Sequence, residues 1–159
     1  MATPVEAFLA QGSALHYWAL VGSVYLLFLS YLDIKTMTVD DRFNWFMIGV
    51  TVSLISFYRH PFSYVLLVLL GVLLLRFFLS YSRVLGRGDV SSMFWIFWGL
   101  ALINIGLLAW YSVFFTITVV LYYSIKYFLY RKEWKRPTPF MPALAASFIA
   151  FAFINGLYW

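Results

Sequence analysis

Residues 90–125 read VSSMFWIFWGLALINIGLLAWYSVFFTITVVLYYSI and contain no charged side chain. A membrane crossing takes about 20 residues, so this run is too long for one span and suits two joined by a tight turn. We predict spans at about 90–109 and 111–130, with the turn at Trp110–Ser112, because aromatic residues gather at membrane interfaces. Asn104 belongs either to that turn region or to a buried contact.

The rest of the chain has the same apolar character. Of its 159 residues, 64% are hydrophobic and 11% are charged, which excludes a soluble domain of this size. We therefore predict an all-α polytopic membrane protein with one membrane-embedded domain over 1–159. The remaining spans are expected at about 14–32, 43–58, 62–79 and 140–159, and the N-terminus lacks the basic region of a cleavable signal peptide.

Six spans would place both termini on one side of the membrane. In that arrangement ten of the eleven lysines and arginines fall on the other side, and only Arg59 does not. Because basic residues mark the cytoplasmic side, both termini are predicted to face outward, in a multi-pass protein of the cell membrane. The net charge of +5 is then explained by topology and not by nucleic-acid binding. The ten residues are Lys35, Arg42, Arg76, Arg83, Arg87, Lys126, Arg131, Lys132, Lys135 and Arg136.

Gly86-Arg87-Gly88-Asp89 stands directly before the long uncharged run, at the predicted cytoplasmic face. One interpretation is structural, since an aspartate there can cap the helix that starts near Val90. The other is chemical, because ionisable groups at membrane depth are costly and mark functional sites. The two glycines would let the backbone turn tightly and approach a substrate closely.

A second aspartate, Asp33, ends the first predicted span at the same face. Two carboxyl groups that meet share one proton, and such a pair can hydrolyse a peptide bond. The spacing of Asp33 and Asp89 leaves two interpretations open: a catalytic pair, or two separately solvated side chains.

Four stretches resemble the type IV prepilin peptidases in the order of that family. Asp33–Lys35 with Val39–Asp41 resembles the first aspartate motif, Gly86–Asp89 matches the GxGD motif, and Pro139–Leu144 is similar to the Pro-Phe-x-Pro stretch that starts the last helix. Pro142–Leu144 also resembles the PAL element of presenilin-type GxGD proteases. The likeness covers nearly the whole chain and is greatest to the short archaeal branch, which processes pilin and archaellin precursors.

The resemblance implies a membrane aspartic endopeptidase that removes short leader peptides from prepilin-like or archaellin-like precursors at the cytoplasmic face. Asp33 and Asp89 would form the catalytic dyad, and Gly86 and Gly88 would shape its loop. The prolines of Pro139–Pro142 would place the last helix beside the cleft. Precursor proteins and membrane lipid are the expected partners, without nucleic acid.

The chain departs from the family pattern in the first loop. Asp40 stands where the family usually has proline, which makes Asp40 and Asp41 rival partners for Asp89. They are also candidates to pair with a basic leader, although a solvated loop explains them as well. Two other functions are weighed: an intramembrane protease of other transmembrane substrates, and a small proton-coupled transporter.

No cofactor and no metal are expected. The chain has no cysteine, which excludes disulfides, thiolate zinc sites and a thiol nucleophile. His16 and His60 lie away from the aspartates and are interpreted as interfacial residues. Gly99 and Gly106 are interpreted as sites of close helix packing.

Overall fold

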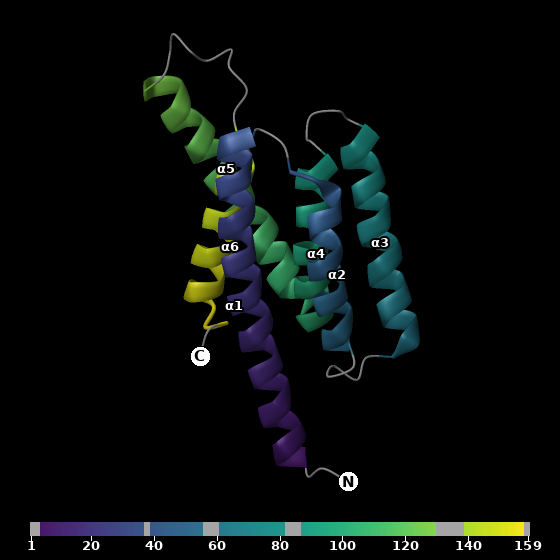
Figure 1. The fold of residues 1–159 in the computed structure, drawn as a ribbon. Helices are drawn as coiled ribbons and strands as arrows, with labels where there is room; N and C mark the ends of the chain where they lie inside the picture. Colours follow the sequence, from purple (N-terminus) through teal and green to yellow (C-terminus); the bar gives the residue numbers. More distant parts are fainter. Residues whose placement is uncertain (1–3, 37–38, 56–60, 82–86, 130–138, 158–159) are drawn as a thin grey trace.

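The computed structural model describes residues 4–36, 39–55, 61–81, 87–129 and 139–157. Within these ranges every regular element is a helix and there is no strand, which confirms the all-α class for the described part of the chain. The helices are α1 (Pro4–Thr36), α2 (Asp41–Ile55), α3 (Phe62–Tyr81), α4 (Arg87–Ile103), α5 (Ile105–Leu129) and α6 (Met141–Ile154). Consecutive helices run in alternate directions, and α5 slants across the others (Figure 1).

Helix α4 is the centre of the bundle. Every residue from Val90 to Leu102 is buried, as expected for a helix that is apolar on all its faces. It packs against α2, α3 and α5, while α6 packs against α1 and α5. Asp89 therefore lies in the first turn of this buried helix.

The outer surface of the bundle is strongly apolar. On α3, Leu67 is 71% exposed and Phe77 is 65% exposed, and on α5 Ile117, Val120 and Leu121 are each more than half exposed. Exposed apolar surface of this extent marks a membrane or protein contact.

Two helical segments are long and apolar enough to cross a membrane, Gly12–Thr36 and Ile105–Leu129. The apolar segments Phe62–Phe77, Gly88–Ile103 and Met141–Ile154 are shorter. At about 1.5 Å per residue, α4 with 17 residues and α6 with 14 residues span about 21–26 Å, less than the ~30 Å of a hydrocarbon core. The prediction of six spans is thus confirmed only in its coarser form, a helical protein with two candidate membrane-spanning helices.

The predicted turn at Trp110–Ser112 is wrong. These residues lie inside α5, and the break falls at Asn104, between Ile103 and Ile105. Asn104 Oδ1 accepts the Gly106 N–H over 2.7 Å and so caps the start of α5, while the Asn104 N–H bonds the Leu100 carbonyl at the end of α4. Gly106 is exposed, and among the described residues a Cβ there would meet only this amide, so its predicted role in helix packing is wrong too.

Other helix bounds also differ from the predicted spans. Helix α1 begins at Pro4 and not near residue 14, and α6 ends at Ile154, earlier than predicted. The predicted end of the second span, near residue 58, lies outside the described residues. Asp89 lies within the first turn of α4 and not before it.

Large aromatic side chains meet small residues in the core. Trp18 of α1 contacts Trp95 and Phe148 edge-on, with ring centroids 6.1 and 5.5 Å apart. A Cβ on Gly99 would lie 2.2 Å from Trp18 Cζ2, so α4 needs glycine where the indole crosses it. The predicted packing role of Gly99 is confirmed.

Candidate functional site

The ends of α1, α3 and α5 and the starts of α2, α4 and α6 lie toward one end of the bundle (Figure 1). Asp33 lies in the last turn of α1, and Asp89 lies in the first turn of α4. The antiparallel arrangement of the helices thus brings both predicted catalytic residues to the same end.

Asp33 is buried and joined to the start of α6. Its side chain is 6% exposed, and its Oδ2 accepts the Met141 N–H over 3.0 Å. Phe140, the residue that caps α6, provides no side-chain cap of its own. The carboxyl group of α1 therefore satisfies a free N–H of another helix, and this bond fixes one of its two oxygens.

The Pro139–Pro142 stretch contains Met141 and so lies beside Asp33. Pro142 is in the first turn of α6, where a residue without an N–H loses no helical hydrogen bond. The Tyr122 hydroxyl donates to the Pro139 carbonyl over 3.1 Å and so ties α5 to the entrance of α6.

Asp89 is half-buried, and it shares an electrostatic neighbour with Asp33. The Tyr123 hydroxyl of α5 lies within electrostatic range of both carboxyl groups, and Tyr122 lies within range of Asp33. Both carboxyl groups therefore lie within electrostatic range of the end of α5.

Gly88 of α4 lies directly against Val39 of the first loop. A Cβ on Gly88 would lie 2.2 Å from the Val39 carbonyl oxygen and 2.8 Å from Val39 Cβ. Any side chain at this position would push the loop away from α4. Gly88 thus shapes the loop through contact with the protein's own backbone, while Gly86 lies outside the described residues.

Buried polar groups hold the first turn of α4 against α2. Asn44 is fully buried, and its Nδ2 donates to the Gly88 carbonyl over 3.2 Å. Its Oδ1 accepts the Trp95 Nε1–H over 3.3 Å. Ser92 Oγ lies 2.8 Å from Asn44 Oδ1 and 3.0 Å from the Gly88 oxygen. The residue before Asp89 is therefore held from two helices.

Asp40 has a local structural role. It is exposed, and its Oδ1 accepts the Arg42 N–H over 3.0 Å at the start of α2. This is an N-terminal cap, which the solvated-loop interpretation of Asp40 accommodates. Asp41 is the first residue of α2, and its side chain lies outside the described part of the chain.

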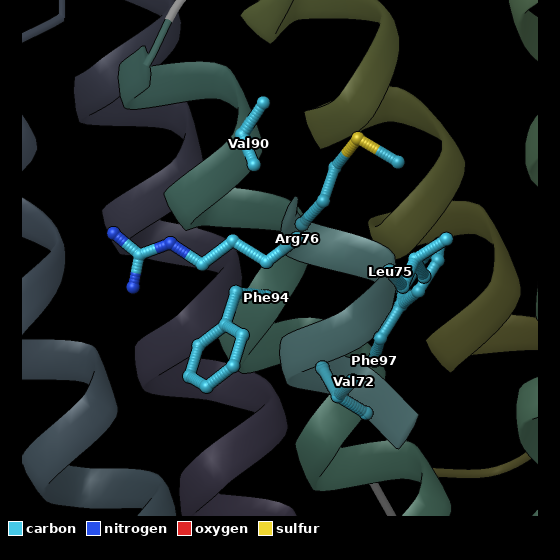
Figure 2. A pocket seen from close by; sticks show the side chains of 7 residues that line it. Val72, Leu75, Arg76, Val90, Phe94 and Phe97 are labelled. Carbon is cyan, nitrogen blue, oxygen red and sulfur yellow. The ribbon is translucent and has the colours of Figure 1, made fainter. Parts of the chain in front are cut away.

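The side chain of Arg76, on α3, lies against α4. Its guanidinium group is 5.5 Å from the Phe94 ring centre, and Nη2 donates to Ser91 Oγ over 3.4 Å. Figure 2 shows the side chain extended across α4 above the Phe94 ring. The surrounding cleft between α3 and α4 has an empty volume of about 170 Å³, and neither predicted catalytic aspartate lines it.

The described residues contain no group of three or more His, Cys, Asp or Glu side chains that could hold a metal ion. Sequence reasoning overlooked Asn44, Ser92, Tyr122 and Tyr123. One signal was present for Asn44, since an amide within an apolar segment needs a partner. Its partners, however, lie on another helix.

Comparison of the chain with protein-family models, with curated proteins and with solved structures gave no match.

Proposed function

We propose that this protein is a membrane aspartic endopeptidase that removes short leader peptides from prepilin-like or archaellin-like precursors. One observation carries the proposal. Asp33 and Asp89, which are far apart in sequence, lie on helix ends at the same end of the bundle, within electrostatic range of the same Tyr123 hydroxyl. The contact of Asp33 with Met141 adds the third motif of the resemblance to the same region.

The proposed chemistry needs only two carboxyl groups and water. One carboxylate takes a proton from water while the oxygen attacks the carbonyl carbon of the scissile bond. The other, protonated, donates to the carbonyl oxygen, and the C–N bond then breaks as the leaving nitrogen takes up a proton. The Met141 N–H holds Asp33 in one orientation for this task.

We further propose that all six helices cross the membrane, with the dyad at the cytoplasmic face. Support comes from the described basic residues, since Lys35, Arg42 and Lys126 lie at helix ends that share the end of Asp33 and Asp89. Helices as short as α4 are compatible with this placement because other helices enclose α4 and shield it from lipid.

The interior gives little support to a proton-coupled transporter. Among the side chains whose burial the structure describes, the buried polar ones are serines, Thr51, Asn44 and a single carboxyl group, Asp33. A proton path would need several ionisable groups along the spans. An intramembrane protease would use the same dyad, and substrate choice separates it from a leader peptidase.

The test is co-expression with a candidate precursor, followed by the mass of the precursor. The protein should shorten the precursor by its leader, and the variant Asp89→Asn should leave it intact. An intact precursor with the parent protein, together with cleavage of an unrelated transmembrane segment, would favour the intramembrane protease. Cleavage of neither substrate would contradict both protease hypotheses.

A further inference from the structure

We propose that Asn44 is a positioning residue for Asp89, because its buried side-chain amide holds the Gly88 carbonyl and so fixes the first turn of α4. This inference rests on the proposed function. It assigns a role to a residue outside the three motifs of the resemblance, on a helix to which that resemblance gives no part in the site.

The orientation of the amide follows from its partners. The Trp95 indole N–H can only donate, so the Asn44 oxygen must face it, at 3.3 Å. The amide nitrogen is then left facing the Gly88 carbonyl, which can only accept, at 3.2 Å. Each end of the amide has the partner its chemistry requires, and the side chain therefore has one stable orientation.

Burial makes this contact strong. Asn44 and Ser92 are both fully buried, and a buried polar group without its partner costs about 1–3 kcal/mol. If α2 separated from the start of α4, the hydrogen bond between the Asn44 amide and the Gly88 carbonyl would be lost. The bonds thus hold the two helices in one register.

The contacts of Asn44 and Val39 hold Gly88, the residue before Asp89. Gly88 precedes Asp89, and its Cα faces the Val39 carbonyl so closely that no Cβ fits. Asn44 holds the oxygen of Gly88 while Val39 covers its α-carbon. The peptide that leads into Asp89 is thereby fixed on two sides, by α2 and by the loop before α2.

The experiment compares Asn44→Leu with Thr51→Val. Thr51 is a matched control because it lies on the same helix, is also fully buried, and also joins two helices, accepting the Trp18 Nε1–H over 3.0 Å. It lies two turns further along α2, away from the aspartates. Thr51→Val loses the bond from Trp18, while Asn44→Leu loses the bonds with Trp95 and Ser92 and the one that holds Gly88.

We expect Asn44→Leu to lower kcat for leader removal by up to about a hundredfold, with KM changed by less than about twofold, since misplacement of a reacting group affects the chemical step. Thr51→Val should lower thermal stability and leave kcat unchanged. If Asn44→Leu does not fold, Ser92→Ala provides the second variant, with a smaller loss of kcat. A kcat of parental size in the folded variant would overturn the inference.

A second measurement does not depend on activity. A cysteine introduced into this cysteine-free chain by Val39→Cys should react slowly with a thiol reagent, because Gly88 covers it. Asn44→Leu should raise that rate severalfold, while a cysteine introduced by Thr36→Cys at an exposed position should react at an unchanged rate.

The two measurements separate the inference from the proposed function. If the parent protein removes no leader, the peptidase function fails, and the labelling rate still tests whether Asn44 holds the start of α4. An unchanged Val39→Cys rate would overturn the positioning role in either case.

Discussion

The chemistry of single residues depends on what their side chains touch. Asp33 is buried against a helix N-terminus, Asp89 is half-buried at the start of the central helix, and Asp40 is an exposed cap. Three aspartates that look alike in the sequence therefore have three environments. Of the three, Asp33 and Asp89 lie within electrostatic range of the Tyr123 hydroxyl in the proposed site.

Asparagine at either dyad position should abolish measurable leader cleavage. An amide cannot accept the proton from water or supply the acid proton, and each such role contributes about 10²–10⁴-fold. Because the two roles depend on each other, the double variant Asp33→Asn/Asp89→Asn should be no worse than the single variants. Cleavage would be followed by mass in detergent, with folding checked by size-exclusion chromatography.

Asp40→Asn is the matched control. Asparagine can keep the cap at the start of α2, since its side-chain oxygen accepts the Arg42 N–H in the same way. This variant should retain clear activity. Loss of activity in Asp40→Asn, with cleavage retained in Asp33→Asn, would mean that the partner of Asp89 lies in the first loop.

At the scale of helices, close approach depends on glycines that meet large or rigid neighbours. Gly88 faces the Val39 backbone, and Gly99 faces the Trp18 indole. Gly71, on the exposed surface of α3, has open space where a Cβ would stand. Replacement by alanine should therefore disturb the packing at Gly88 and Gly99 and leave it undisturbed at Gly71.

Gly88→Ala should reduce leader cleavage strongly while the protein remains helical. The new Cβ would lie 2.2 Å from a backbone oxygen, so the first loop must move away from the start of α4. Gly71→Ala should leave cleavage unchanged, and the loss of a helical glycine stabilises by up to about 1 kcal/mol. Circular dichroism and the cleavage assay would check both variants, and equal activity in the two would contradict the proposed contact.

Gly99→Ala should destabilise the bundle by about 1–3 kcal/mol, as overpacked cores commonly do. Trp18 cannot easily withdraw, since its Nε1–H donates to Thr51 Oγ1 over 3.0 Å. The double variant Gly99→Ala/Trp18→Phe should lose less stability than the sum of the single variants, because the smaller ring makes room. Thermal unfolding of all four proteins measures this coupling, and additive losses would contradict it.

At the scale of the whole molecule, polarity is divided between one end and the sides. Both aspartates of the proposed dyad and several basic residues lie at helix ends that share one end of the bundle, while the sides expose leucine, valine and aromatic residues. This division is the one expected of helices whose sides face a membrane.

Labelling of introduced cysteines should reveal the proposed topology. Cysteines replacing His60 and Trp159 should react with an impermeant reagent from outside the cell. Cysteines replacing Thr36, Ser82 and Lys132 should react only after the membrane is opened, because basic residues are retained inside. Outside labelling at Ser82 would place Asp89 on the wrong side and overturn the proposed site.

The sequence by itself determined the helical class and the ends at which the two aspartates stand. Apolar composition and hydrogen bonding within a helix are local properties, and they can be read from neighbouring residues. Local patterns also placed Asp33 in the last turn of α1 and Asp89 at the start of α4. They misplaced the break at Asn104, where a side-chain amide caps the start of α5 inside an apolar run.

Only the tertiary structure decided which helix ends meet and what holds them. The bond from Met141 to Asp33 joins residues 108 positions apart, and that from Asn44 to Gly88 joins residues 44 apart. Such pairs depend on how side chains of different size fit together, as Trp18 fits against Gly99. Such a fit exists only in the packed bundle, because the residues around either member of a pair do not predict which distant residue it will contact.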